Sequence, residues 1–228
     1  MIDAVHIARR VLANEADALG VLADSLDDAF GQAVAACHGA EGRVICVGIG
    51  KSGHVARKIA STFASTGTPA QFVHPTEASH GDLGMITQHD VVLALSRSGE
   101  TAELSDLLHY AKRFDVLVIG MTAKSGSALA QASDHLLLIP DVPEACSITK
   151  APTTSTTLMM ALGDAMAVSL LEQKGFQADD FRHLHPGGKL GAMLKKVGEL
   201  MRKGSDIPLV SLGASMDEAI RVLSEKNL

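Results

Sequence analysis

Two glycine- and hydroxyl-rich turns are the first candidates for chemistry in this sequence. Gly48–His54 reads GIGKSGH and follows the apolar run Val44–Val47. Ser96–Thr101 reads SRSGET and also follows an apolar run. Glycine lets the backbone approach a ligand closely, and the free amides at the start of a helix attract anions. Both turns are therefore candidate phosphate sites.

The two turns carry the groups that a phosphate monoester needs. Lys51 adds a mobile positive charge to the first turn. Hydroxyls or backbone amides come from Ser52, Ser96, Ser98, Gly99 and Thr101. A single Ser98 would already serve as an ordinary helix N-cap, but three hydroxyls around one glycine favour a ligand. A third turn of similar texture, Met121–Leu129, is a weaker candidate and can be explained by helix capping alone.

The first turn matches the known nucleotide-binding motifs less well than it matches a site for a phosphate monoester. Gly48, Gly50 and Gly53 match the GxGxxG dinucleotide pattern. That pattern also requires an acidic residue at the end of the next strand, and here the nearest acid, Glu77, lies beyond a proline. A P-loop would need glycine at position 45, which is Ile45. A sugar phosphate remains as the favoured ligand.

Several residues could move protons on such a sugar. Interconversion of an aldose phosphate and a ketose phosphate transfers a proton between C1 and C2 through a cis-enediol, which requires a base and a group that stabilises the oxyanion. It requires no redox cofactor. The candidates are Glu103, Glu144, His185 and Lys51, with Glu100 more simply explained as an acid that favours a helix N-terminus. We expect a glutamate to act at C1 and C2, His185 to open the ring and Lys51 to act as electrophile.

The segment VHPTEASHGDLGM contains two histidines, His74 and His80. With Glu77 and Asp82 nearby they could ligate a metal. Substrate hydrogen bonding, or a plain surface position, is the alternative for both.

The elements that must position these residues alternate along the chain. Short, wholly apolar runs at 44–47, 70–73, 91–95, 116–119 and 135–139 predict strands, and segments 52–66, 101–113 and 126–132 predict helices. This alternation predicts an α/β fold with a doubly wound, parallel five-stranded sheet that is covered by helices on both faces. The candidate turns would then share the carboxyl edge of the sheet, where open α/β sheets bind ligands.

Two further helical segments flank this region. Residues 2–38 show helical spacing of apolar residues, and segment 153–171 is apolar on nearly all sides. A helix without a polar face must be buried. We expect 153–171 to contact another subunit, and so predict a homo-oligomer; a central core helix in a monomer is the alternative.

Composition bounds the class of protein. The net charge is −6, aromatic residues make up 3% and tryptophan is absent, which argues against a nucleic-acid partner. The three cysteines form no paired pattern, and the N-terminus lacks the core of a signal peptide. No uncharged apolar stretch reaches about 20 residues, so we expect a cytoplasmic protein without a membrane partner.

These motifs together resemble a known family. The segments that carry the resemblance are GIGKSGHVARKIASTFASTGTPAQFVHPTEASHGDLGM, SRSGETAEL, PEAC, APTTSTT and HPGGKLG. They are similar to the sugar isomerase (SIS) domain of D-arabinose 5-phosphate isomerases. The resemblance implies an N-terminal helical segment at 1–38, a SIS domain at 39–195 and, at 196–228, the incomplete first half of a cystathionine-β-synthase-type (CBS) pair. In that last segment we expect a strand near 208–210 and a helix from Met216.

The resemblance also implies an activity and a set of site residues. The family interconverts D-ribulose 5-phosphate and D-arabinose 5-phosphate, the precursor of 3-deoxy-D-manno-octulosonate in lipopolysaccharide or capsule. Lys51, Glu103, Glu144 and His185 match its catalytically important positions. Substrate-contact positions match Gly67, Thr68, His74 and His80. The resemblance further implies a homotetramer, and zinc binding at His74 that inhibits and is not required.

Two other functions remain open at this stage. A non-catalytic SIS sensor of a sugar phosphate would keep the serine-rich turn but could lose the acids, so the joint presence of Glu103, Glu144 and His185 favours an enzyme. A nicotinamide oxidoreductase would lack its ribose-binding acid.

Overall fold

In the computed structural model of the protein, the described residues are 3–146, 148–185 and 197–227. The chain forms two compact units, Met1–Leu184 and His185–Leu228. The predicted boundary after residue 195 lies outside the described residues. Because the first unit contains the sheet, it positions every predicted site residue except His185.

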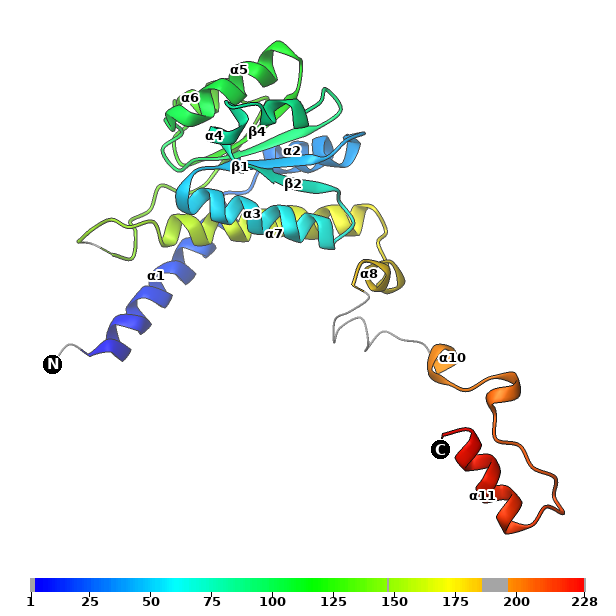
Figure 1. Cartoon of the computed structure of the whole chain (residues 1–228). Coiled ribbons are helices and arrows are strands. Elements are labelled where there is room, and N and C mark those ends of the chain that lie inside the picture. The colour runs from blue at the N-terminus through cyan, green and yellow to red at the C-terminus, as the bar shows by residue number, and fades with distance from the viewer. Residues whose placement is uncertain (1–2, 147, 186–196, 228) are drawn as a thin grey trace. The chain divides into compact units, whose positions relative to one another are not determined.

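The first unit is built on one parallel five-stranded sheet (Figure 1), as the apolar runs predict. The strands lie in the order β2-β1-β3-β4-β5. Their bounds are β1 Val44–Gly48, β2 Ala70–Val73, β3 Val91–Leu95, β4 Leu117–Thr122 and β5 His135–Leu138. All five predicted strands are confirmed to within three residues at each end. Every residue of β1 and of β3 is buried, which explains why these runs show no polar alternation.

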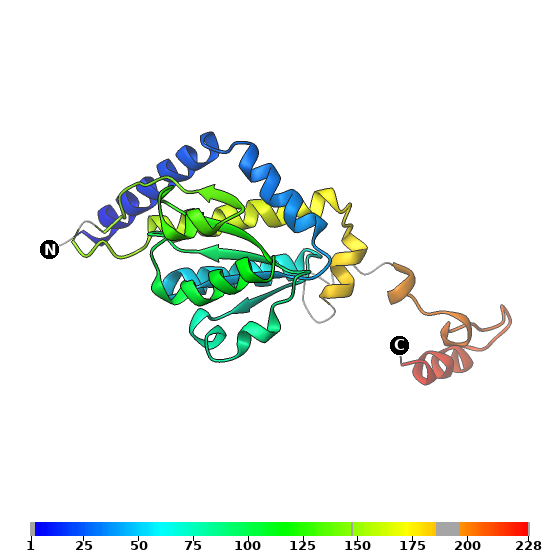
Figure 2. The ribbon, with the colours of Figure 1, turned by 90° about the horizontal axis from the view of Figure 1, so that it is seen from above.

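Helices cover both faces of this sheet (Figures 1 and 2). One face packs on α1 Ala4–Asp24, α2 Asp28–Gly39, α3 Gly50–Ser65 and α7 Thr154–Gln173. The other packs on α4 Pro75–Ala78, α5 Ser105–Arg113 and α6 Ala128–Ala132. Alternate residues of each strand point to opposite faces of the sheet, so each face has its own hydrophobic core. Cys46 and Leu93 belong to the core on the side of α3 and α7, while Ile45 and Val92 belong to the core on the other side. The doubly wound α/β prediction is confirmed.

Local signals explain where the helices begin. The N-terminal segment is two helices rather than one, because Asp27 accepts a hydrogen bond from the Ala29 amide and starts α2. The predicted helix 101–113 begins as a 3₁₀ turn, Ala102–Leu104, before α5. A further 3₁₀ turn, Asp82–Met85, follows α4, and α8 spans Ala178–Leu184.

Helix α7 is the central helix of its layer. It packs against α1, α2 and α3, and Asp164 on its outer side forms an ion pair with Lys58 of α3. Among the described residues it is the one helix whose length and mean hydropathy of 1.3 would suit a membrane span, and half of that window is buried inside the protein. This packing accounts for much of its apolar composition, while Met160 and Val168 remain exposed.

The second unit is short where the structure describes it. It holds α10 Val197–Leu200, a 3₁₀ turn at Gly204–Asp206 and α11 Met216–Glu225. The predicted helix from Met216 is confirmed, with Ser215 accepting the Glu218 amide as its N-cap. The predicted strand near 208–210 is wrong, because these residues have no pairing partner among the described part of the chain. The CBS assignment stays a prediction.

Candidate active site

The two predicted phosphate turns lie side by side at the carboxyl edge of the sheet. The strand order β2-β1-β3-β4-β5 reverses direction between β1 and β3, whose last residues Gly48 and Leu95 are paired. Open α/β sheets bind ligands at this switch point. The turn after β1 and the turn after β3 form its two walls, so the sequence prediction of a shared edge is confirmed.

Glycine is required in the first turn for steric reasons. Gly50 has a φ of +54°, and a Cβ on Gly53 would lie 2.6 Å from the carbonyl oxygen of Gly48. The backbone at the start of α3 therefore contacts the end of β1 directly, and no side chain caps the N-terminus of α3. Lys51 is exposed and has no hydrogen-bond or ion-pair partner among the described residues, while Ser52 is half-buried near the Met159 sulfur. Lys51 is therefore available to a ligand.

The second turn is stiffened by its own hydroxyls. Ser96 Oγ lies 2.8 Å from Thr101 Oγ1 and accepts the Gly99 amide at 3.0 Å. Ser98 Oγ accepts the Glu100 amide at 3.2 Å and stays exposed. Ser96 and Thr101 therefore hold the turn Ser96–Thr101, the proposed phosphate cradle, in its conformation. Ser98 is the most exposed of the three hydroxyls.

Two neighbouring glutamates in this turn differ in their surroundings. Glu100 Oε1 accepts the Ala128 amide at 3.0 Å, so it caps α6 rather than the helix that follows it in sequence. Glu103 is exposed in the 3₁₀ turn before α5 and has no hydrogen bond or ion pair to the described residues. Glu103 is the carboxylate that remains free to act on a bound sugar.

Glu144 is brought to the same edge but is heavily engaged. Its side chain is 2% exposed and accepts hydrogen bonds from Thr153 and Ser155 at the start of α7. The shortest of these, from Ser155 Oγ, is 2.5 Å. Burial acts to raise the pKa of Glu144, but the hydrogen bonds from Ser155 and Thr153 and the guanidinium of Arg97 together hold it below its ordinary value.

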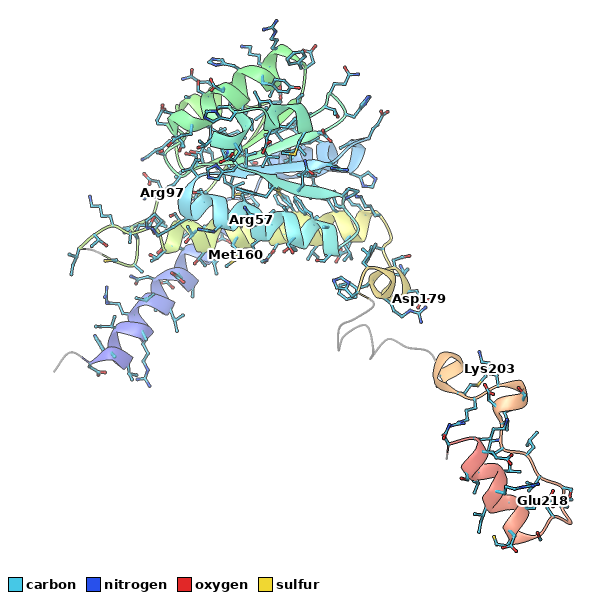
Figure 3. All side chains as sticks on the ribbon, in the orientation of Figure 1. Arg57, Arg97, Met160, Asp179, Lys203 and Glu218 are labelled. Carbon is cyan, nitrogen blue, oxygen red and sulfur yellow. The ribbon has the colours of Figure 1, made fainter. Side chains whose placement is uncertain are left out.

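Sequence reasoning missed the residue that joins these parts, Arg97. Its Nε lies 3.3 Å from Glu144 Oε1, and its terminal nitrogen reaches Asp141 at 3.3 Å and the Val142 carbonyl at 3.4 Å. Lys124, after β4, also pairs with Asp141. Figure 3 shows Arg97 at the end of the sheet where α3 and α7 begin. Charged residues just after three successive strands were the sequence signal that could have revealed this network.

A cavity of about 570 Å³ lies beside this network. It is lined by Arg97, Lys124, Asp141, Val142, Pro143, Glu144, Cys146 and Lys150. Another hollow, of about 450 Å³, lies at the opposite, amino edge of β4, and no predicted site residue lines it. Only the first of these two hollows adjoins the serine-rich turn.

The histidine segment follows β2 at the same edge. His74 immediately precedes α4 but its side chain makes no capping hydrogen bond, and its buried Nδ1 has no hydrogen-bond partner among the described residues. His80 is exposed. The described residues contain no group of three His, Cys, Asp or Glu side chains that could hold a metal ion. One donor from this chain would therefore need others from water, from a ligand or from another molecule.

Two predicted residues, Gly67 and Thr68, are not brought to this edge. Gly67 and Thr68 lie at the amino edge of the sheet, before β2, where Gly67 packs on the Phe176 ring and Thr68 Oγ1 accepts Lys174 Nζ at 2.9 Å. His185 belongs to the second unit. Within one chain the structure thus groups Lys51, Ser52, His74, His80 and Glu144 with the Ser96–Glu103 segment, and leaves Gly67 and Thr68 apart.

Comparisons with known proteins identify the family and the fold. The SIS domain family model matches residues 39–169. Arabinose 5-phosphate isomerase KdsD of Pseudomonas aeruginosa PAO1 is 49% identical over 228 residues, all of this chain and 70% of that protein. KdsD of Escherichia coli K12 is 44% identical over 227 residues, 99% of this chain and 69% of that protein. The structure of E. coli CFT073 c3406 in complex with arabinose 5-phosphate, at 42% identity, superposes with a TM-score of 0.77 and covers 80% of this chain and 97% of that one.

Proposed function

The chain belongs to the SIS domain family, and we infer from this premise that it is an arabinose 5-phosphate isomerase. It interconverts D-ribulose 5-phosphate and D-arabinose 5-phosphate and so supplies the precursor of 3-deoxy-D-manno-octulosonate. The observation that carries this conclusion is the similarity to KdsD over the whole chain, at up to 49% identity. Further support comes from the two glycine-rich turns that meet at the switch point and from Glu103, whose carboxylate is exposed in the segment after β3.

The phosphate of the sugar binds in the turn Ser96–Thr101. Ser98 and the backbone amides there donate hydrogen bonds to it, and Lys51 from the neighbouring turn is left for the reacting end of the sugar. The phosphate does not react, so the free energy of binding it serves to orient the reacting carbons C1 and C2. We assign the predicted substrate contacts at His74 and His80 to the same edge.

Glu103 is the base in this proposal. Its carboxylate takes a proton from C1 of the open-chain ketose, which leaves a cis-enediolate with the negative charge on O2. O2 then gains a proton and O1 loses one, and Glu103 returns its proton to C2, so that C1 becomes the aldehyde carbon of the aldose. Lys51 stabilises the oxyanion that forms between these two steps. The support is geometric: both side chains are exposed at one edge and neither is occupied by another described residue. His185 is retained as the ring-opening residue that the family resemblance implies.

Four further properties are part of the proposal. Isomerisation through an enediol needs no cofactor, and zinc at His74 would act only as an inhibitor. The chain assembles as a homo-oligomer, a tetramer by family resemblance, and works in the cytoplasm. Exposed apolar side chains on α1, among them Val5 and Leu12, support assembly. Gly67 and Thr68 stay predicted substrate contacts that one chain alone does not bring to the cradle.

Proton NMR of D-ribulose 5-phosphate in deuterated water tests this function, with no metal or nicotinamide added. We expect arabinose 5-phosphate to form with deuterium at C2, because the base exchanges its proton with solvent. An unchanged spectrum, with the sugar phosphate nevertheless bound, would support the sensor function instead. In that case Glu103 would have no role in proton transfer.

A further inference from the structure

One ion pair joins two segments of the site that lie far apart in the sequence. Arg97 belongs to the serine-rich turn after β3, and Glu144 belongs to the connection between β5 and α7. Their side chains meet at 3.3 Å, with Glu144 2% exposed and Arg97 39% exposed. Removing one partner of such a pair would leave the buried carboxylate without its counter-charge.

The surroundings of Glu144 leave little room for proton transfer. The Thr153 amide and hydroxyl donate to Oε2 at 2.8 and 3.3 Å, and the Ser155 amide donates to it at 3.2 Å. Ser155 Oγ donates to Oε1 at 2.5 Å, and Arg97 Nε faces the same oxygen. A carboxylate offers about four acceptor positions, and five donors already surround this one. A base needs a free lone pair that can reach the proton it removes.

The charges around Glu144 also favour its ionised form. Arg97 faces it from the β3 turn, and the amides and hydroxyls at the start of α7 face it from the other side. The other titratable side chains that line the adjoining cavity are Lys124, Asp141, Cys146 and Lys150. From α1, Arg10 reaches the Ala145 carbonyl next in sequence at 3.5 Å. Glu144 is therefore an anion whose carboxylate is held by two segments of the fold, the turn after β3 and the start of α7.

We propose that Arg97 and Glu144 form a positioning pair for the isomerase reaction. Glu144 is anchored to the start of α7 and holds Arg97, which in turn fixes the turn Ser96–Thr101 that cradles the phosphate. This inference rests on the proposed function and deepens it, since it separates the two glutamates: Glu103 transfers the proton and Glu144 positions the cradle. A displacement of about 1 Å in such a cradle can lower the rate on the order of 100-fold.

A double-mutant cycle tests the pair through activity. We expect Arg97→Gln and Glu144→Gln each to lower kcat/KM by about 10- to 100-fold, and the double variant to resemble the worse single one, because the two side chains act as a unit. Arg97→Lys should recover part of the loss, because it keeps the charge. Losses that multiply in the double variant would overturn the proposal. So would complete loss of deuterium exchange in Glu144→Gln while Glu103→Gln retains it.

A titration tests the same pair without relying on activity. Carbon-13 NMR of the glutamate carboxyls, with the Glu144 signal assigned by its absence in Glu144→Gln, should show its pKa rising in Arg97→Gln. Lys124→Gln is the matched control: it removes a cation from the same cavity that pairs with Asp141 and not with Glu144, so the Glu144 titration should stay in place.

The two tests separate the possible failures. A Glu144 pKa that is unchanged in Arg97→Gln would overturn the pair, whatever the chain catalyses. A wild-type chain that isomerises no pentose 5-phosphate would overturn the proposed function. The titration would still show whether Arg97 lowers the pKa of Glu144. If Arg97→Gln fails to fold, as judged by thermal unfolding, the charge-retaining Arg97→Lys variant carries both measurements.

Discussion

Three glutamates lie in or beside the turn Ser96–Thr101, and their surroundings differ although their side chains are the same. Glu100 accepts the Ala128 amide and caps α6. Glu144 is enclosed by donors from α7 and by Arg97. Glu103 is exposed and has no partner in the part of the chain that the structure describes. The same type of side chain therefore caps a helix at Glu100, is fully engaged by donors at Glu144 and stays exposed at Glu103.

Glu103→Gln and Glu100→Gln form a matched pair of substitutions. We expect Glu103→Gln to lower kcat by about 10²- to 10⁴-fold, because it removes the general base that we propose. Glu100→Gln should keep most of kcat and lose about 0.3–1 kcal/mol of stability, because the α6 N-terminus loses a negative charge. Steady-state kinetics and thermal unfolding of both variants make the comparison. Equal losses of kcat would show that the choice of Glu103 is incorrect.

The anchored state of Glu144 predicts a pH-dependent stability. Its pKa is lower in the folded protein than in the unfolded chain, so its stabilising contribution is present above the ordinary glutamate pKa of about 4.3 and is lost as the pH falls through the folded-state value. The difference in free energy of unfolding between wild type and Glu144→Gln should therefore shrink from pH 7 toward pH 3. Urea unfolding across this range measures it, and a difference that does not change with pH would contradict the account.

At the scale of elements, the serine-rich turn depends on its contact with the start of α6. Gly99 has a φ of +68°, and a Cβ there would lie 2.4 Å from Ser127 Cβ. We expect Gly99→Ala to cost about 1–3 kcal/mol and to raise KM, because the turn must move away from α6. Gly126→Ala, in the next turn, is the control, since a Cβ there meets nothing within 4 Å. Thermal unfolding and KM should be affected in the first variant only.

The packing of α3 on α7 gives a second test at this scale. A Cβ on Gly163 would lie 2.4 Å from the fully buried Ile59 side chain. Gly163→Ala should therefore destabilise the protein by about 1–3 kcal/mol through overpacking. Gly20→Ala, on the exposed side of α1 with no atom within 4 Å, should instead stabilise it by about 0.5–1 kcal/mol. Chemical denaturation measures both, and a stabilised Gly163→Ala variant would rule out a tight α3–α7 contact.

At the scale of the whole molecule, the exposed apolar side of α1 bears on assembly. Val5 is 60% exposed and Leu12 is 66% exposed, and Figure 1 shows the N-terminal half of α1 running away from the sheet. We expect Leu12→Gln to weaken self-association by at least tenfold in dissociation constant while leaving the thermal unfolding of the first unit intact. Asp17→Asn, exposed on the same helix, is the control. Sedimentation equilibrium measures both, and a monomeric wild-type chain would contradict the proposed oligomer.

The sequence by itself determined the parallel sheet and the place of the two glycine-rich turns at its carboxyl edge. Both depend on short-range patterns: wholly apolar runs such as Val91–Leu95 require burial on two faces, and a glycine-rich turn after such a run must lie at the carboxyl edge. The same local patterns singled out Lys51 and Glu103, which the resemblance matched to catalytic positions and which the structure leaves exposed at that edge. None of these features needs information about which distant segments touch.

Only the tertiary structure decided which of these residues are free and which are held. Arg97 meets Glu144 across 47 positions of sequence, Glu100 caps a helix 28 positions away, and Thr68 is placed at the far edge beside Lys174. A strand near 208–210 was expected and did not form, because a strand exists only with a partner. Long-range contacts of this kind depend on how the layers pack against each other, and they cannot be predicted from local patterns of residue type.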